Sequence, residues 1–312
     1  MKALLSSGTL KAPPCITFLS AELNPIPAMK HLAFLTSLSL LLSLLAIPAF
    51  AGEGALKLTL SQTECTQGEF FIVEAKGAQD EPTLFFMERK WQMFPEKEGR
   101  WIAMVPAENL STPGGYAFLL QDGEREQRRE VRVKASSLPV QYITLRGSKA
   151  GLHATETEKT RVRAALHSLT TEKLNRGPFT LPCNGAVTSI FGRKRSYNGG
   201  PATSYHKGVD FGAPSGTPIL APASGAVVLA GTVEEGFVVH GNTVILDHGR
   251  GLTSVYLHMS AITVKEGDLV QQGEEIGRVG HTGISTAPHL HWGTYLYGIS
   301  VNPLLLLKES AL

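Results

Sequence analysis

Short alternating runs of apolar and polar residues fill two separate parts of the chain. The first part holds six such runs, divided by Gly, Pro, Asn and Asp: LKLTLSQ, FFIVEAKG, TLFFMERKWQMF, RWIAMVPA, GYAFLLQDG and REVRVKAS. A period of two, interrupted by closely spaced turn residues, is typical of a small antiparallel sandwich. The pattern predicts an immunoglobulin-like β-sandwich over residues 52–145. Because His, Asp and Glu form no catalytic pattern there, we interpret it as a packing or placement domain.

A charged stretch, AGLHATETEKTRVRAALHSLTTEKLN, follows at residues 150–175. It lacks proline, has glycine only near its start, and contains enough helix-forming residues for one amphipathic helix. We expect this helix within a connector over residues 146–180, with His153 and His167 solvated on its surface.

The second alternating part is rich in glycine. GTPILAPASGAVVLAG, NTVILDHG, LTSVYLHMS, DLVQQGEEIGRVG and HLHWGTYLYG lie between turn residues, and no segment has the pattern of a long helix. An all-β domain over residues 181–312 is therefore predicted. The chain of 312 residues, 43% hydrophobic and 18% charged, is long enough for both domains, so the predicted fold class is mainly β.

The N-terminal region has the features of an export signal. MKHLAFLTSLSLLLSLLAIPAFA combines a lysine, an uncharged leucine-rich run and an A-x-A site. We expect residues 29–51 to be a signal peptide cleaved after Ala51, and residues 1–28 to be an upstream extension outside the native protein. An uncleaved anchor is the alternative, because the apolar run is nearly long enough to span a bilayer. It would be the chain's only contact with a membrane.

Export places the protein in the periplasm or cell envelope, or in the external medium. Gly52 stands where a lipoprotein has cysteine, so no lipid anchor is expected. Cys65 and Cys183 remain after processing, in different predicted domains, and we expect them to be unpaired. The net charge of +2, without a block of Lys or Arg, argues against a nucleic-acid partner.

Two histidines stand one residue apart in GISTAPHLHWG. On a strand, His289 and His291 point to one side while Leu290 points into the core. Imidazole nitrogens are zinc ligands, and a catalytic zinc keeps three protein ligands and an open position for water. A zinc site at this strand needs a further ligand from elsewhere in the chain.

YHKGVDFGAPSGTPI supplies two candidates for it, His206 and Asp210. Gly208 and the nearby proline argue against a helix, and on a straight strand the two residues lie about 13 Å apart, too far to share an ion. A bend at Gly208 would bring them together. By itself the pair is equally consistent with an ordinary surface pair. His240, His248 and His281 are expected to be structural or loop residues.

Several segments in this order resemble the lysostaphin-type (LytM-like) zinc endopeptidases of bacterial cell walls. The segments are SIFGRKR, HKGVDFGAPSGTPILAPASGAVVLAG, GNTVILDHGRGLTSVYLHMS, VKEGDLVQQGEEIGRVGHTGISTAPHLHW and VNP, over about residues 185–305. The resemblance implies an antiparallel β peptidase fold related to lipoyl-type hairpin sandwiches, with one zinc ion per chain. It also implies the zinc ligands His206, Asp210 and His291, and the catalytic residues His258 and His289.

The chemistry of such a site is consistent with the hydrolysis of peptide bonds. Zinc polarises a carbonyl and lowers the pKa of water, one neutral histidine accepts a proton, and another donates a hydrogen bond to the oxyanion. We favour His289 as the base and His258 as the oxyanion stabiliser, although the sequence does not separate the two roles.

The resemblance also implies a substrate, the peptide stems of peptidoglycan. We expect D-alanyl cross-links rather than glycyl bridges, because no SH3-like wall-targeting domain is recognisable. A catalytically silent wall-binding or amidase-activating module is the alternative, and the complete set of five site residues argues against it. A second alternative is a latent enzyme whose N-terminal β domain covers the groove. The sequence leaves the oligomeric state open.

Overall fold

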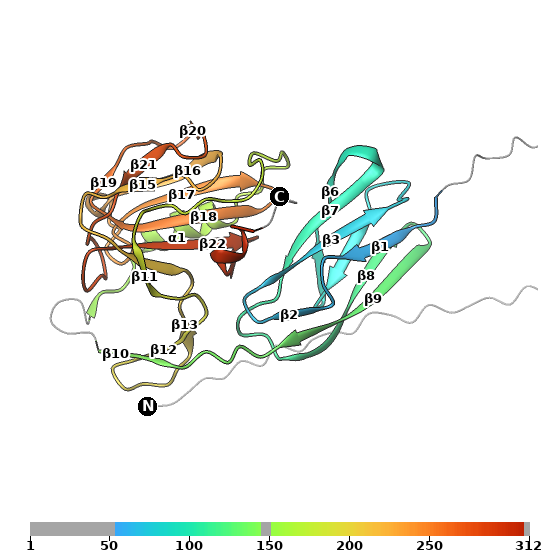
Figure 1. Ribbon diagram of the computed structural model, residues 1–312, viewed down its shortest axis with the longest axis horizontal. Coiled ribbons are helices and arrows are strands. Elements are labelled where there is room, and N and C mark those ends of the chain that lie inside the picture. The colour runs from blue at the N-terminus through green and yellow to red at the C-terminus, as the bar shows by residue number, and fades with distance from the viewer. Residues whose placement is uncertain (1–53, 145–150, 309–312) are drawn as a thin grey trace, which may run out of the picture. The chain divides into compact units, whose positions relative to one another are not determined.

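The computed structural model describes residues 54–144 and 151–308. β-Strands dominate this part of the chain, and its one α-helix is α1 (Figure 1). The predicted mainly β class is therefore confirmed. The predicted upstream extension and signal peptide lie outside the described residues. Among the residues that are described, no helix has the length and apolar character needed to cross a membrane.

Residues 57–134 form two sheets around one apolar core. The first sheet runs in the order β1 (Lys57–Leu60), β3 (Phe70–Lys76), β7 (Arg100–Pro106) and β6 (Phe94–Pro95), with the short 3-10 helix η1 at Lys97–Gly99. The second runs in the order β2 (Glu64–Thr66), β9 (Arg125–Lys134), β8 (Gly114–Asp122), β4 (Thr83–Phe86) and β5 (Arg89–Trp91). β2 pairs parallel with β9, which departs at this edge from the antiparallel pairing expected of the sandwich.

The alternating runs of the sequence explain how these sheets pack. Phe71, Phe86 and Phe118 are at most 1% exposed, and the stacked rings of Phe86 and Phe118 have centroids 4.2 Å apart. The run at residues 83–94 breaks where Met87 and Glu88 adopt φ values of 49° and 60°. Two consecutive residues with positive φ make the tight turn that joins β4 to β5.

The strand β10 (Gln141–Ile143) precedes the connector, and the connector contains one helix, α1 (Glu156–Leu166), as the sequence predicts. Thr155 caps α1 by accepting a hydrogen bond from the Glu158 backbone N–H at 3.1 Å. Beyond the helix, Ser168 and Thr170 donate their hydroxyls to the buried carboxylate of Asp247, at 2.8 and 2.7 Å. These contacts hold the residues that follow Leu166 in a non-helical conformation, so the helix does not continue beyond Leu166. His153 and His167 are exposed, as predicted.

An eight-stranded antiparallel sheet forms the centre of the C-terminal region. Its order is β11 (Ala186–Ser189), β14 (Val209–Gly212), β22 (His289–Leu296), β18 (Leu252–Met259), β17 (Asn242–Gly249), β16 (Gly225–Gly231) and β20 (Leu269–Val270), with β23 (Ile299–Val301) paired to β22. A smaller sheet contains β15 (Pro218–Leu220), β21 (Glu275–Arg278) and β19 (Ala261–Ile262). Another joins β10 to β12 (Lys194–Tyr197) and β13 (Ser204–Tyr205), and the 3-10 helices are η3 (Val233–Glu235) and η4 (Pro303–Leu305).

The strand β22 lies between β14 and β18 in the sheet, and Figure 1 shows it beside β18. Its register pairs His291 with Asp210 of β14 and with Leu257 of β18. Leu290 is fully buried, as the alternation predicts. Pairing across β14, β22 and β18 therefore brings residues that are distant in the sequence to one place.

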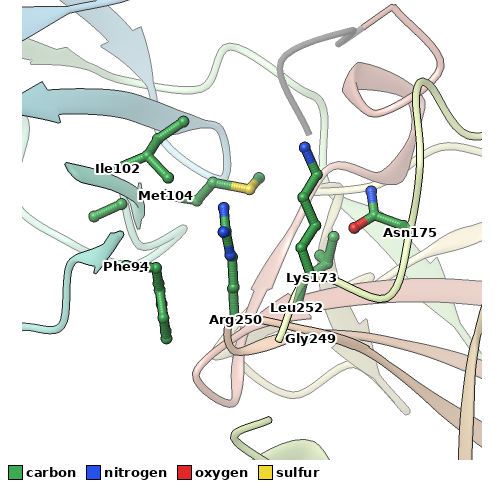
Figure 2. Close-up of a pocket in the computed structure, with 9 residues that line it drawn as sticks. Phe94, Ile102, Met104, Lys173, Asn175, Gly249, Arg250 and Leu252 are labelled. Atoms are coloured by element: carbon green, nitrogen blue, oxygen red, sulfur yellow. The ribbon is translucent and has the colours of Figure 1, made fainter. Parts of the chain in front are cut away.

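The two β regions contact each other near the start of β18 and the end of β22. His258 and His289 lie at the other ends of these two strands. The ring of Trp91 packs edge-on against Tyr297, which follows β22, with centroids 5.4 Å apart. Arg250, which precedes β18, pairs with Glu96 at 2.6 Å. Figure 2 shows Arg250 among the side chains that line a cavity at this contact.

Both cysteines of the described residues are buried and free, which confirms the prediction that they are unpaired. Burial raises the pKa of the Cys183 thiol to about 11. The thiol therefore stays protonated near neutral pH and is a poor nucleophile or metal ligand there.

Candidate metal centre

Three side chains converge between β14 and β22. The Nε2 atom of His206 lies 2.9 Å from Asp210 Oδ1 and 3.1 Å from His291 Nδ1. The His291 Nδ1 atom is in turn 2.9 Å from the same Asp210 oxygen. These residues form a cluster whose donor atoms could hold one metal ion. The structure therefore brings together the three side chains that the sequence singled out as candidate ligands.

A bend at Gly208 makes this convergence possible, as the sequence predicts. A Cβ atom built at Gly208 would lie 2.4 Å from the Trp292 carbonyl oxygen and 2.7 Å from His291 Nε2. No side chain fits there without a shift of β22. Glycine thus allows the chain to turn between His206 and Asp210 and to approach β22 closely.

A hydrogen bond to the backbone sets the tautomer of the neutral His206 ring. Its Nδ1 atom is 2.9 Å from the carbonyl oxygen of Ile190, which can only accept a hydrogen bond. Nδ1 therefore carries the proton of the neutral ring, and Nε2 directs a lone pair toward Asp210 and His291. Orientation of a ligand ring by a backbone carbonyl is common in metal sites.

Burial and charge determine the pKa values of the other two residues. Burial lowers the pKa of His291 to about 4, although Asp210 opposes the shift. Burial raises the pKa of the Asp210 carboxyl, but contacts with His206 and His291 outweigh it and hold the pKa well below its usual range. At neutral pH the cluster therefore presents the Asp210 carboxylate and a neutral His291 ring.

This donor set fits zinc. An electron pair of His206 and a carboxylate oxygen lie 2.9 Å apart with little water around them, an arrangement that is unfavourable without a cation or a shared proton. Zinc binds imidazole nitrogen and carboxylate oxygen at about 2.0–2.2 Å in tetrahedral geometry, which places ligand atoms roughly 3.4 Å from one another. The observed separations are close to that value.

The two predicted catalytic histidines lie beside this cluster. The Nε2 atom of His289 is 3.9 Å from Asp210 Oδ1, and its Nδ1 faces the carbonyl oxygen of Ala287 at 2.8 Å. The rings of His258 and His289 have centroids 4.9 Å apart. Because the side chain of His289 is 18% exposed whereas that of His206 is fully buried, His289 lies on the solvent side of the site.

The ring of His258 has a different hydrogen-bond partner from that of His289. Its Nδ1 donates to the carbonyl oxygen of Thr282 at 2.9 Å, so its Nε2 carries no proton in the neutral ring. The pKa of His258 is lowered to about 3. Burial is the largest cause, and the electrostatic effects of the nearby His291 and His289 add to it. The backbone at His258 has a φ of 65°, which is uncommon for a residue other than glycine and marks a constrained position.

One charged neighbour of the site, Arg195, was not predicted from the sequence. The Nη2 atom of Arg195 lies 3.7 Å from Asp210 Oδ2, and its Nε donates to Gln141 Oε1 at 3.2 Å. Arg195 reaches Asp210 because the short strands β12 and β13 fold back beside β14. The basic run RKR gave no signal of this, since its position depends on long-range strand pairing.

His248 has the structural role that was expected. It is fully buried, donates from Nδ1 to the Ser224 carbonyl oxygen at 2.8 Å, and lies 2.7 Å from Ser254 Oγ through Nε2. Burial lowers the pKa of His248 to about 4. The ring is therefore neutral at pH 7 and belongs to the interior of the sheet, away from the metal cluster.

Comparison with known sequences places the site in a family. Residues 204–303 match the family model of peptidase family M23. The chain is 43% identical over 99 residues to the DD-carboxypeptidase/endopeptidase Mpg of Neisseria meningitidis, a match that covers 32% of this chain and 22% of Mpg. It is 36% identical over 118 residues to the peptidoglycan DD-endopeptidase ShyA of Vibrio cholerae, covering 38% of this chain and 26% of ShyA. The chain thus spans about a quarter of the length of these relatives.

Comparison with solved structures extends the similarity beyond the metal site. A crystal structure of a peptidase M23 protein from Pseudomonas aeruginosa superposes with a TM-score of 0.59 and 28% sequence identity, covering 78% of this chain and 94% of that one. That coverage is larger than the M23 segment, so the similarity continues outside the C-terminal region. Through its C-terminal β domain, this chain belongs to peptidase family M23, the lysostaphin-type metallopeptidases.

Proposed function

We propose that this chain is an exported zinc metallo-endopeptidase of the bacterial cell envelope that hydrolyses D-alanyl cross-links between peptidoglycan stems. One zinc ion per chain would be held by His206, Asp210 and His291. The observation that carries the proposal is the convergence of these three donors, with two further histidines beside them. The names of Mpg and ShyA, both described as endopeptidases, support the choice of substrate.

Each residue of the site would have a separate role in hydrolysis. Bound zinc supplies Lewis-acid polarisation of the scissile carbonyl and acidifies water at the site. The Ile190 carbonyl keeps the Nε2 lone pair of His206 directed at the metal position. Arg195, near the outer oxygen of Asp210, favours the charged carboxylate that a metal ligand requires.

His289 is placed to act as the general base. With Nδ1–H donated to Ala287, its Nε2 holds a free electron pair near the cluster and can accept a proton from the attacking water. The protonated ring can then return that proton to the leaving amine. Its partial exposure allows a substrate peptide to reach it.

His258 can stabilise the oxyanion only when Nε2 carries a proton. The neutral ring keeps its proton on Nδ1, facing Thr282, and burial disfavours the charged ring. A negative charge that develops beside the ring raises its pKa, so protonation of Nε2 becomes favourable as the oxyanion forms. Because the proton of the attacking water goes to His289, the role we favour for His258 requires a second proton, taken up from solvent as the oxyanion forms and released to solvent when the oxyanion collapses.

Digestion of purified peptidoglycan tests the proposal. The mature chain, loaded with zinc, should clear wall material in a zymogram and release uncross-linked muropeptides that mass spectrometry identifies by their D-alanyl ends. His289→Ala should abolish the release, whereas His167→Ala, on the exposed end of the connector helix, should not change it. Binding to the wall without any release would instead identify a silent wall-binding or amidase-activating module.

A further inference from the structure

The connector helix α1 is attached to the segment that follows η3 by polar side chains along one face. At its start, Thr155 Oγ1 donates to the Gly236 carbonyl oxygen at 2.9 Å. Nearly two turns further along, Arg161 pairs with Glu235 of η3 at 3.1 Å and with Glu266 at 2.6 Å. Between these contacts lies Glu158, which is fully buried although it is a charged residue type.

The Glu158 carboxylate is bound by three donors of one short segment. It accepts from the Val239 backbone N–H at 3.1 Å, from the His240 backbone N–H at 2.7 Å, and lies 2.5 Å from His240 Nδ1. Burial raises the pKa of Glu158, but its contacts with His240 and Val239 outweigh burial and hold the pKa below its usual value. Because a buried charge is tolerated only where its partners stay in place, this carboxylate fixes the backbone of residues 238–241.

The other side of the same segment holds His258. The His240 carbonyl oxygen accepts the His258 backbone N–H at 3.0 Å. The pairing of β17 with β18 shifts register between Asn242 and Val244, opposite His258, so this N–H lies at an irregularity of the ladder. The backbone N–H of His240 thus binds Glu158, and its carbonyl oxygen binds His258.

The ring of His258 is linked to the segment by a second route. Its Nδ1 donates to the Thr282 carbonyl oxygen at 2.9 Å, and the Thr282 hydroxyl accepts from the Asn242 backbone N–H at 3.0 Å. The Val239 carbonyl oxygen also accepts from Ile284, two residues beyond Thr282. A displacement of residues 238–242 would therefore move both the backbone and the ring partner of His258.

We propose that Glu158 is a positioning residue for His258, acting from the connector helix through the backbone of residues 238–242. This inference deepens the proposed function and rests on it for the catalytic importance of His258. A residue other than glycine at positive φ is strained and keeps that conformation only where its surroundings hold it. His258 has that conformation, and Glu158 stabilises the segment that receives its N–H.

The experiment compares four full-length mature chains loaded with zinc: wild type, Glu158→Ala, Glu158→Gln and Arg161→Met. Glutamine keeps an oxygen that can accept the two backbone N–H groups but removes the charge. Arg161→Met removes the neighbouring polar contacts of the same helix and leaves Glu158 in place, so it is the matched control. The measurements are kcat and KM on a cross-linked muropeptide, and the imidazole ¹⁵N–¹H resonances of His258 and His291.

Misplacement of a reacting group by about 1 Å can lower a rate by about a hundredfold. We therefore expect Glu158→Ala to lower kcat by about ten- to a hundredfold, with KM changed less than about twofold. The His258 resonances should shift while those of His291 do not. Glu158→Gln should recover most of kcat, and Arg161→Met should lower the melting temperature while kcat and the His258 resonances stay the same.

An unchanged kcat and unshifted His258 resonances in folded Glu158→Ala would overturn the proposal, and so would an equal loss of kcat in Arg161→Met. If Glu158→Ala does not fold, Glu158→Gln decides the question: a smaller shift of the His258 resonances supports the proposal, and no shift overturns it. If the wild type hydrolyses no muropeptide, the proposed function fails. The resonances still show whether Glu158 positions His258.

Discussion

The sandwich and the C-terminal β domain bury different kinds of residue. Among the described residues of the sandwich, Asn109 and Asp122 are the buried polar ones. From residue 181 onward the buried polar residues are Ser189, Ser196, His206, Thr243, Asp247, His248, Thr253, Ser254, His258, Ser285, His291, Thr294 and Ser300. An apolar core requires only matching shapes, whereas each buried polar group requires a partner in a defined direction.

The same contrast is found along the single strand β22. Leu290 and Trp292 are fully buried among apolar neighbours on one face. His289 and His291 alternate with them and face Asp210 on the other. The strand therefore contributes to the apolar core with one face and presents the candidate site residues with the other. Substitutions in the sandwich should reduce stability, and substitutions on the polar face should reduce activity.

The largest effect is expected at the metal cluster. Asp210→Ala removes a carboxylate that lies between two imidazoles, so bound zinc and the charge stabilisation it supplies should both be lost. A loss of about 4 kcal/mol corresponds to a fall in kcat/KM of about 10³-fold. Metal analysis and muropeptide hydrolysis measure both quantities. Full zinc content with unchanged turnover would show that Asp210 is not a ligand.

A substitution in the sandwich core should lower stability and leave zinc content and turnover unchanged. Phe118→Ala removes a ring that stacks on Phe86 and packs edge-on against Phe71, and should lower the free energy of unfolding by about 4 kcal/mol. Below the melting transition, zinc content and kcat should match the wild type, because Phe118 contacts no residue of the metal cluster. Chemical denaturation and steady-state kinetics provide the comparison. A tenfold loss of kcat in the folded variant would mean that the sandwich participates in catalysis.

The smallest effect concerns a buried polar residue away from the metal cluster. The pKa of His248 is about 4 in the folded protein and 6.5 for the unperturbed side chain. The unfolded chain therefore binds a proton between these values and the folded one does not, so the stability contributed by His248 is complete above pH 6.5 and is lost as pH falls toward 4. The loss is about 3 kcal/mol.

His248→Gln keeps a donor and an acceptor near Ser224 and Ser254 but does not titrate. Between pH 6.5 and pH 4, the free energy of unfolding of this variant should fall less steeply than that of the wild type. The difference in slope should correspond to about one proton fewer taken up on unfolding. The difference between the two proteins isolates His248 from the other buried histidines. Equal slopes would mean that His248 has the same pKa in the folded and unfolded states.

The sequence determined the strands, the turns and the identity of the candidate donors. Alternation with a period of two located β3, β7, β17 and β22, because one-sided burial leaves that pattern in any sequence. It also identified His206, Asp210, His291, His258 and His289, since their spacing matches a known family. It missed β2, which depends on pairing with β9, and it did not locate the end of α1, beyond which the chain binds the buried carboxylate of Asp247.

Only the tertiary structure decided which atoms meet. The register of β14, β22 and β18 places Asp210 opposite His291, and the bend at Gly208 brings His206 to them. The contact of Arg195 with Asp210, and the burial of Glu158 against His240, join segments far apart in the chain. No local pattern encodes such contacts, because they follow from how separate strands and a helix pack. The sequence therefore specified the chemistry of the site, and packing specified its geometry.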